Sequence, residues 1–417
     1  MVGVRWIPWQ RLPTMPLRTG FTTGQAGTGK TRLFKDKIEA DPSFGILTAT
    51  TGTAAVNLGA TTINSWLGYQ DTDDLRKEIA NHQISRRVWS MKEKGDLWEG
   101  ATIVIDEVSM MEDAQLDLIY QAFLSIEKYV PDVGLELVGD FCQLPPVNGR
   151  YAFLAASWSA FAANITKLTK QWRQHDPIFL EGLNAVRRGD GAAAVELLGQ
   201  AGVTYGSFSD PSFGGVTVLG TNKDVDKIND SSYRSLVGSE RIYKTKSTGF
   251  LKSEWKPPRF PTHLALKVGA RVMVTANETK NWSYVNGDIG TVVEMGETYV
   301  QVLLDRSPTP VDVMWTTLEH IDPTFRGPRW MAKRDNRIVG KVEFLPIRLA
   351  YALTIHKCQG LTLDKVQFDV SNQFIGNPAM VYVALSRART PEGLRVIGNK
   401  NILQKRIKIS EEVRPWL

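Results

Sequence analysis

The sequence predicts an α/β protein with a phosphate-binding loop, in which two parallel α/β units follow each other and a small β-barrel interrupts the second. Three observations predict this fold. The stretch GQAGTGKT (24–31) fits the phosphate-loop pattern G-x-x-x-x-G-K-[ST]. Short apolar runs alternate with helical stretches from 44 to 140 and again from 215 to 399. Between 270 and 340 the pattern changes to short β runs separated by Gly, Asn and Pro turns.

The first α/β unit is predicted from three apolar runs that end in small or acidic residues. They are FGILTAT (44–50), ATIVIDE (101–107) and LELVGD (135–140), and each is typical of a buried parallel strand. Helical stretches begin at TGTAAVNLG and cover MEDAQLDLIYQAFLSIEKYV between them. Ligands of such sheets bind at the carboxyl ends of the strands. Lys30, Asp106 and Asp140 are all expected at that edge.

The second unit is predicted from four further strand signals, which are 215–222, 343–356, 365–370 and 394–399. The runs ARVMVTAN, DIGTVVEM, YVQVLLD and VDVMWTT lie between the first two of these signals, with no helix long enough to intervene. We therefore expect a small antiparallel barrel that is inserted into the second unit.

Composition excludes some classes of protein. The chain has 417 residues, 42% of them apolar, and no run of eighteen apolar residues that could span a membrane. Cys142 and Cys358 match no metal spacing, so a reducing compartment is expected: the cytoplasm of a bacterium or a phage-infected host, or a eukaryotic nucleus or mitochondrion. Residues 1–20 are predicted to be an irregular lead-in, with a mitochondrial presequence as the alternative. The net charge of +6 favours a polyanionic partner only weakly.

The phosphate loop predicts which residues hold a nucleotide. Its backbone N–H groups and the helix N-terminus behind them would surround the phosphates. Lys30 would contact the β- and γ-phosphates, and Thr31 would bind Mg²⁺ with Asp106. Glu107 follows at the strand end, where it could polarise the attacking water. The expected loop residues are Gly24, Gln25, Ala26, Gly27, Thr28, Gly29, Lys30 and Thr31.

Three further polar residues are candidates for sensing or neutralising the γ-phosphate. Gln143 follows the strand end at Asp140 and carries a neutral amide, whereas the prolines after it are a turn signal. Arg173 in LTKQWRQ and Arg387 in VYVALSRART are candidates for arginine fingers. Each arginine taken singly is better explained as a surface residue.

The segment LTIHKCQGLTLD (353–364) is predicted to be a polar loop that faces a ligand groove. It contains His356, Lys357 and Gln359 before a glycine. A metal site is not expected, because no other ligand cluster stands at a suitable spacing. The stretch TNKD (221–224) does not match the guanine-specific pattern N-K-x-D, since Val225 stands where the aspartate is needed.

Ten segments occur in a fixed order: GQAGTGK, TATTGTAA, TTINSWLG, IDEVSMM, GDFCQLPPV, LTKQWRQ, TNKDVDKIN, NGDIGTVV, TIHKCQGLTLD and YVALSRA. With this order the sequence resembles the superfamily 1B DNA helicases, the group of the PIF-type helicases, the RecD subunit and the phage Dda helicase. The resemblance covers about residues 21–400.

The resemblance implies two RecA-like lobes that bind ATP and Mg²⁺, with single-stranded DNA crossing both lobes. It identifies Lys30, Thr31, Asp106, Glu107, Gln143, Arg173 and Arg387 with the nucleotide residues of the group. It identifies Thr50, Thr51, Asn64, Thr354, His356, Lys357 and Gln359 with its DNA-binding residues. The activity implied is ATP-dependent 5′-to-3′ translocation and unwinding of forked duplex DNA by a monomer, and the polarity follows from the resemblance alone.

The resemblance also implies the domain plan: residues 1–165 as lobe 1, residues 166–269 and 341–417 as lobe 2, and residues 270–340 as an SH3-like barrel. Arg271, Lys280, Trp282 and Tyr284 of the barrel are candidates to guide a strand, although the two aromatic residues could equally fill its core. Segment 67–100, with Trp89 and Trp98, lies where the group carries its strand-separating element.

The sequence departs from the group upstream of the phosphate loop. The group has a helix there with a glutamine that reads adenine, whereas only Gln10 is present here, among prolines, and the strand signal before the loop is weak. Two alternatives to a helicase stay open: a DNA-stimulated ATPase or translocase subunit that does not unwind, and a nucleotide-binding module without hydrolysis. The sequence does not separate DNA from RNA, or replication from repair, recombination and telomere roles.

Overall fold

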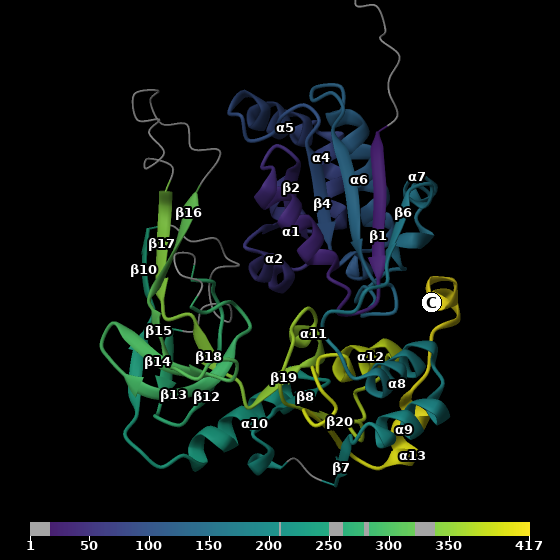
Figure 1. Cartoon of the computed structure of the whole chain (residues 1–417). Coiled ribbons are helices and arrows are strands. Elements are labelled where there is room, and N and C mark those ends of the chain that lie inside the picture. Colours follow the sequence, from purple (N-terminus) through teal and green to yellow (C-terminus); the bar gives the residue numbers. More distant parts are fainter. Residues whose placement is uncertain (1–16, 208–209, 250–261, 279–282, 322–337) are drawn as a thin grey trace, which may run out of the picture. The chain divides into compact units, whose positions relative to one another are not determined.

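The computed structural model describes residues 17–207, 210–249, 262–278, 283–321 and 338–417 (Figure 1). They form two compact units. The first contains the described residues up to Phe141 together with Pro145–Lys170, and the second contains Cys142–Leu144 and the described residues of Gln171–Leu417. Each unit has its own parallel sheet, which confirms the prediction of two parallel α/β units. No helix among the described residues is long and apolar enough to cross a membrane.

The sheet of the first unit has the strand order β3-β2-β4-β5-β1-β6, and its pairings are parallel. Its strands are β1 (Arg18–Gly24), β2 (Gly45–Ala49), β3 (Thr61–Thr62), β4 (Thr102–Asp106), β5 (Gly134–Gly139) and β6 (Ile165–Leu168). β4 is buried at every position, as expected for a parallel strand inside a sheet. The three strands predicted in this unit are thus confirmed as β2, β4 and β5.

The helices of the first unit pack on this sheet or on one another through apolar side chains. They are α1 (Lys30–Ala40), α2 (Gly52–Leu58), α3 (Ile63–Leu67), α4 (Thr72–Ala80), α5 (Gln83–Glu93), α6 (Asp113–Ile126) and α7 (Trp158–Ala162). Phe34 of α1 packs against Val104 and Val138 of β4 and β5. Trp66 of α3 stacks on Phe123 of α6, with ring centroids 6.2 Å apart. These contacts hold α1, which follows the phosphate loop, against the strands that carry Asp106 and Asp140.

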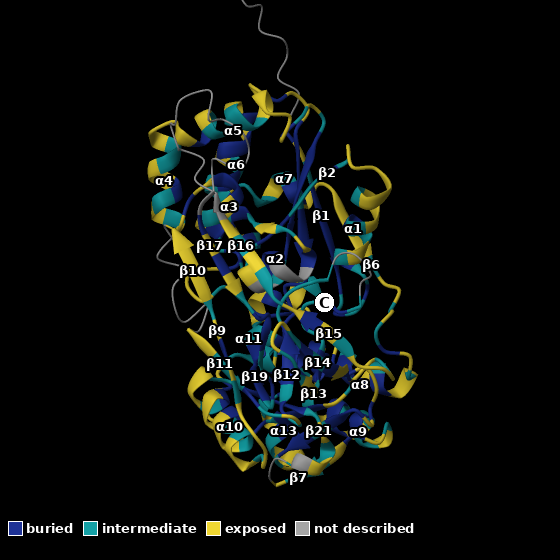
Figure 2. Ribbon diagram, turned by 90° about the vertical axis from the view of Figure 1, so that its left-hand side faces the viewer, coloured by how far each residue is buried: buried dark blue, intermediate teal, exposed yellow. Residues whose placement is uncertain are grey.

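The strand before the phosphate loop is strong, and the expectation of a weak strand is wrong. β1 lies between β5 and β6, and Figure 2 shows it buried along most of its length. Its sequence is poor in apolar residues because it faces a polar side chain on β5. Thr22 Oγ1 donates to Glu136 Oε1 at 2.6 Å, and a Cβ on Gly20 would collide with the same carboxylate. The strand therefore lacks an apolar signal, although threonine and phenylalanine are favoured in strands.

The segment expected to separate strands folds as the helices α4 and α5. Asp71 is the N-cap of α4, and its side chain accepts from the N–H of Asp74 at 2.8 Å. Trp98 is half-buried, and its Nε1 donates to the carbonyl of Ser43 at 2.8 Å. Trp89 remains 51% exposed and meets Tyr129 edge-on. Trp98 is therefore a packing residue, whereas Trp89 is open to a ligand.

The second unit has a parallel sheet in the order β19-β8-β20-β21-β7. Its strands are β7 (Thr204–Gly206), β8 (Val216–Leu219), β19 (Ala352–Thr354), β20 (Val366–Asp369) and β21 (Leu394–Ile397). Its helices are α8 (Pro177–Arg188), α9 (Gly191–Gln200), α10 (Asn222–Ser235), α11 (Ile355–Cys358), α12 (Pro378–Leu385) and α13 (Lys400–Arg406).

Antiparallel strands run through residues 241–349 between α10 and β19, and we call them the insert. They are β9 (Arg241–Lys244), β10 (Lys246–Gly249), β11 (His263–Leu266), β12 (Arg271–Val274), β13 (Ile289–Met295), β14 (Tyr299–Leu304), β15 (Val311–Met314), β16 (Thr316–Ile321), β17 (Ile338–Phe344) and β18 (Ile347–Leu349). They form sheets in the orders β15-β14-β13-β12-β18, β10-β17-β16 and β11-β9. The antiparallel strands thus extend on both sides of the expected 270–340.

The insert has its own core because apolar side chains alternate along its strands. Val272 and Val274 of β12 and Val300 and Val302 of β14 are fully buried in one cluster, as the two-residue period of a strand requires.

The expectation that residues 343–356 form one strand of the second parallel sheet is wrong. The chain there forms β17, β18 and β19, because Pro346 has no N–H to continue a ladder, and only β19 joins the parallel sheet.

Candidate functional site

The phosphate-loop motif connects β1 to α1, in the structural context that the motif requires. Gly29 is the N-cap of α1 with a φ of 81°, a left-handed conformation that glycine adopts without steric cost. A Cβ on Gly24 would collide with the carbonyl oxygen of Leu168, so only glycine fits at the end of β1. The first turn of α1 contains no acid, and its N–H groups and helix dipole suit an anion.

Lys30 lies inside the curve of this loop. It is only 8% exposed, and its Nζ donates to the carbonyl oxygens of Gly24 at 2.7 Å and of Gln25 at 3.0 Å. A buried ammonium needs such acceptors or an anion to offset its lost hydration. The loop therefore holds a positive charge at the place where its backbone N–H groups also gather.

The carboxyl end of β4 brings Asp106 to the start of α1. Thr31 Oγ1 donates to Asp106 Oδ2 at 2.6 Å, and the N–H of Glu107 donates to Asp106 Oδ1 at 2.8 Å. Burial raises the pKa of Asp106 to about 7, the charge of Glu107 adds to this, and the two hydrogen bonds oppose it. The site thus holds a buried carboxyl beside a hydroxyl, both of which are oxygen ligands of the kind that Mg²⁺ prefers.

Glu107 has a backbone conformation that is rare for a residue other than glycine. Its φ is 57°, which lies in the left-handed region. Thr50 holds the turn, because its Oγ1 donates to the carbonyl of Glu107 at 2.8 Å and its N–H donates to the carbonyl of Asp106 at 3.0 Å. The ends of β2 and β4 are thereby joined, and the two acids lie at a fixed edge of the sheet.

Two other residues predicted to bind DNA take part in local hydrogen bonds. Thr51 Oγ1 accepts from the N–H of Ala54 at 3.2 Å. Asn64 Nδ2 donates to the carbonyl of Gln70, and its Oδ1 accepts from Gln115 Nε2, both at 3.2 Å. The amide of Asn64 is therefore oriented by two partners, and Gln115 also donates to the hydroxyl of Tyr69 at 2.8 Å.

Asp140 and Gln143 are both buried after β5. Asp140 is fully buried and Gln143 is 4% exposed. Gln143 belongs to Cys142–Leu144, which clusters with the second unit although the residues on either side belong to the first.

Of the residues predicted to bind nucleotide or DNA, the first unit brings together Lys30, Thr31, Asp106, Glu107 and Thr50.

The second unit brings together the two candidate arginines. Arg387 is 1% exposed, and its guanidinium donates to the carbonyls of Val383 at 2.8 Å and Leu361 at 3.2 Å. Arg173 Nη1 donates to the carbonyl of Ser386 at 3.0 Å, directly before Arg387 in the chain. A surface location for Arg387 is therefore wrong. The motifs around 173 and 387, which are distant in sequence, are neighbours in space.

Gln174 was missed by sequence reasoning. It is 2% exposed, and its Nε2 donates to the carbonyls of Ser386 at 3.1 Å and Ala388 at 2.8 Å. One amide thus holds the peptide on both sides of Arg387. Its position beside Arg173 in QWRQ was the signal available in the sequence.

The segment that contains His356 and Lys357 forms the end of β19 and the short helix α11. Thr354 is buried and caps this helix, since its Oγ1 accepts from the N–H of Lys357 at 3.3 Å. Gln359 is buried as well. His356 and Lys357 are half-buried, and burial lowers the pKa of each. The two basic side chains are therefore the partly accessible side chains of α11.

The insert residues expected to guide a strand are mostly committed elsewhere. Tyr284 is 4% exposed and belongs to the apolar core. Arg271 forms two hydrogen bonds with Asp305, at 2.7 and 2.6 Å. Lys280 and Trp282 lie outside the described residues, as does Gln10 upstream of the phosphate loop.

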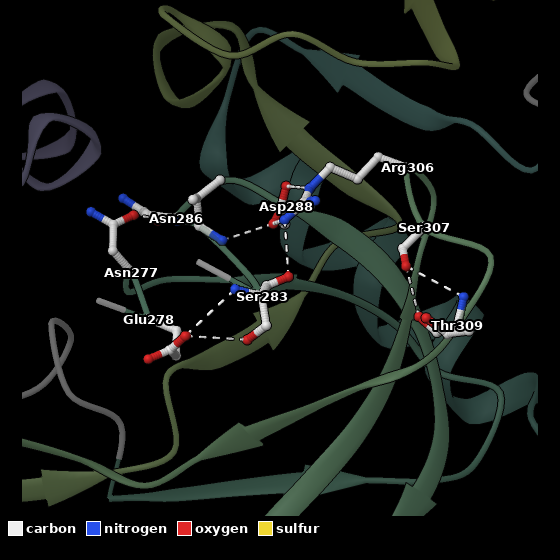
Figure 3. Close-up of polar contacts among 9 residues, drawn as sticks. Asn277, Glu278, Ser283, Asn286, Asp288, Arg306, Ser307 and Thr309 are labelled. Carbon is white, nitrogen blue, oxygen red and sulfur yellow. Dashed lines mark hydrogen bonds and ion pairs between the residues drawn. The ribbon is translucent and has the colours of Figure 1, made fainter. Parts of the chain in front are cut away.

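The loop that joins β12 to β13 is also tied by ion pairs and hydrogen bonds. Figure 3 shows Asp288 accepting from Arg306, at 2.8 and 2.7 Å, and Asn277 Oδ1 accepting from the N–H of Asn286 at 2.8 Å. Asp288 and Arg306 therefore neutralise each other at this loop.

A phosphate loop before α1, with Asp106 and Glu107 at the end of β4, defines the class of P-loop nucleoside triphosphatases, and the two parallel sheets are RecA-like. Family models agree with this class. One described as "AAA domain" matches residues 10–206, and one described as "Viral superfamily 1 RNA helicase core domain" matches residues 337–392.

Two curated relatives are similar to nearly the whole chain. "ATP-dependent DNA helicase PIF1" of Danio rerio is 32% identical over 397 residues, which cover 90% of this chain and 58% of that protein. "ATP-dependent DNA helicase Pif1" of Bdellovibrio bacteriovorus is 32% identical over 400 residues, which cover 92% and 85%. The chain belongs to the Pif1 family of ATP-dependent DNA helicases, and it spans about 58% of the length of the vertebrate relatives.

Solved Pif1 structures have the same fold. The Pif1 helicase of Candida albicans gives a TM-score of 0.72 at 26% identity, covering 96% of this chain and 95% of that one. Pif1 of Bacteroides sp in complex with ADP-AlF4 gives 0.67 at 25% identity, covering 95% and 90%. Bacteroides Pif1 bound to single-stranded DNA gives 0.60 at 27% identity, covering 95% and 91%.

Proposed function

We propose that this protein is an ATP-dependent DNA helicase that moves 5′ to 3′ along single-stranded DNA and unwinds forked duplexes. The observation that carries the proposal is the arrangement of Lys30, Thr31, Asp106 and Glu107 around one loop, in a chain of the Pif1 family. Its relatives are named ATP-dependent DNA helicases, and Bacteroides Pif1 was solved with ADP-AlF4 and with single-stranded DNA.

Lys30 and the loop N–H groups bind the phosphates in this proposal. The ammonium exchanges the carbonyls of Gly24 and Gln25 for phosphate oxygens, which carry more negative charge and accept stronger hydrogen bonds. Lys30 is already buried at the loop, so the exchange needs little further desolvation. Residues Gly24–Thr31 form this phosphate site.

Thr31 and Asp106 fit a magnesium ion. A magnesium ion at this site would use one carboxylate and otherwise phosphates and water. Asp106 is a buried acid whose raised pKa reflects a charge without full compensation, and a cation would supply that compensation. When bound, magnesium would neutralise charge on the β- and γ-phosphates.

The remaining polar residues complete the hydrolytic site in this proposal. Glu107 orients and polarises the attacking water, and its turn is fixed by Thr50. Gln143 senses the γ-phosphate through its amide. Arg173 and Arg387 stabilise the charge that develops in the transition state, with Gln174 holding the peptide around Arg387.

The DNA residues are proposed on both units. They are Thr50, Thr51 and Asn64 on the first unit, and Thr354, His356, Lys357 and Gln359 on the second. His356 and Lys357 are the basic members and would contact phosphates. The insert is proposed to be SH3-like, and the protein is proposed to act as a monomer. The proposed lobes are residues 1–165 and residues 166–269 with 341–417.

The test is ATP hydrolysis with and without single-stranded DNA, followed by unwinding of a forked duplex. A helicase hydrolyses ATP faster with the single strand and then separates the fork. Stimulated hydrolysis without strand separation would instead show a translocase subunit, and no hydrolysis at all would show a nucleotide-binding module.

A further inference from the structure

Arg348 is a half-buried cation at the edge of the insert. It lies on β18, whose only partner in the five-stranded sheet is β12, and it pairs there with Met273. Its Nη2 donates to Met273 Sδ at 3.7 Å, and its Nε is buried without a hydrogen-bond partner in the described structure. Burial lowers its pKa. The Nε–H group has therefore lost water without gaining an acceptor.

A second cation lies close to Arg348. Lys357 of α11 is half-buried, and after burial itself the positive charge of Arg348 is the next influence that lowers its pKa. Asp226 of α10 acts in the opposite direction, but it is exposed. Within the described part of the chain, neither cation forms an ion pair with an acid. The positive charges of Arg348 and Lys357 therefore lie near each other in a partly buried environment.

The insert supplies acids for two of its other arginines. Arg271 on the adjacent strand β12 is paired with Asp305, and Arg306 is paired with Asp288. Within this five-stranded sheet, Arg271 is therefore neutralised by an acid, whereas Arg348 on the edge strand forms no ion pair in the described structure. A pair of neighbouring cations becomes favourable when an anion binds both, and a guanidinium matches a phosphate in geometry.

The backbone between Arg348 and Lys357 is held by a side chain of α10. Asn229 of α10 donates from Nδ2 to the carbonyl of Ala352 at 3.2 Å, and its Oδ1 accepts from the N–H of Ala352 at 2.9 Å. This double contact fixes β19, which connects Arg348 to Lys357. Preorganised donors lose little entropy when a ligand binds.

We propose that Arg348 and Lys357 together bind one phosphodiester of single-stranded DNA. Arg348 is thereby a DNA contact that the insert contributes. It lies on β18, the last strand of the insert, which the chain leaves to form β19 of the parallel sheet. The inference rests on the proposed function, and it adds a residue that the motif segment 354–360 does not contain.

The test compares Arg348→Met with Arg271→Met in binding to a fluorescent oligothymidylate, without nucleotide, from 50 to 200 mM salt. Each phosphate contact contributes about 0.7 to the slope of log affinity against log salt for a single strand. Arg348→Met should lower the slope by about 0.7 and weaken binding about tenfold. Its Tm should not fall, since a poorly solvated charge is removed.

Arg271→Met is the matched control, because it removes the same side chain from the neighbouring strand of the same sheet. Its charge is already paired with Asp305, so its slope should equal that of the parent while its Tm falls. Arg348→Lys should restore the slope. An unchanged slope for a folded Arg348→Met, or the same loss of slope for Arg271→Met, overturns the inference. Failure of the parent protein to bind the strand at any salt overturns the proposed function instead.

Discussion

Asp106→Asn should stabilise the protein in the absence of nucleotide while it abolishes ATP hydrolysis. In the folded protein, burial raises the pKa of Asp106 from 3.8 to about 7. A group with a raised folded-state pKa contributes stability that is fully present below pH 3.8 and is lost as the pH rises through about 7. The asparagine has no charge, and it can still accept from Glu107 N and donate to Thr31 Oγ1.

The magnitude follows from the same values. Each tenfold difference in acidity corresponds to about 1.4 kcal/mol. The gain over the parent should therefore be about 2–4 kcal/mol at pH 8 and about 1–2 kcal/mol at pH 5. For a unit of this size that corresponds to a rise in Tm of about 5–15 °C at pH 8.

The assay is thermal unfolding at pH 5 and pH 8, without magnesium or nucleotide, together with phosphate release at pH 8. Glu107→Gln is the control, because the charge of Glu107 is the second cause of the raised pKa of Asp106, and it should give a smaller gain in the same direction. Added magnesium should stabilise the parent and leave Asp106→Asn unchanged. An Asp106→Asn variant that is less stable than the parent at pH 8 would refute this account of a buried, uncompensated acid.

Two further predictions concern the proposed hydrolytic residues. Lys30→Ala should abolish hydrolysis and leave single-strand binding intact, which phosphate release and fluorescence anisotropy would show; loss of DNA binding without nucleotide would contradict separate sites. Arg173→Ala should lower kcat by about 10³-fold or more while ATP still binds. Arg387→Ala should also lower kcat, and it should lower the Tm as well, because the guanidinium of Arg387 donates to the buried carbonyls of Val383 and Leu361. If either variant hydrolyses ATP at the parent's rate, that arginine is purely structural.

The sequence predicts best those features that depend on local patterns. The parallel strands of the first unit are continuous apolar runs, and the phosphate loop must join a strand to a helix, so β2, β4, β5 and α1 are predictable. β1 is different, because its polar residues are explained by partners distant in sequence, such as Glu136 for Thr22 and Ala160 for Thr19. The break of 343–356 into three strands depends on which partner each part finds.

The candidate site divides in the same way. Motif spacing locates Lys30, Thr31 and Asp106 because each follows a strand or begins a helix. Pairing is not local, and so the sequence shows Arg271 and Arg348 alike as basic residues, although one is neutralised by Asp305 and the other has no acid in contact. Gln174 was missed for this reason as well, since its partners follow it by more than two hundred residues.

The central claim is tested most directly by strand separation on duplexes that differ only in the polarity of a single-stranded tail. With ATP and magnesium, the protein should unwind a duplex with a 5′ tail and leave one with a 3′ tail intact, and Lys30→Ala should unwind neither. Unwinding only from the 3′ tail, or equal unwinding from both, would contradict 5′-to-3′ translocation. ATP hydrolysis stimulated by the single strand, without unwinding of either substrate, would contradict the assignment as a helicase.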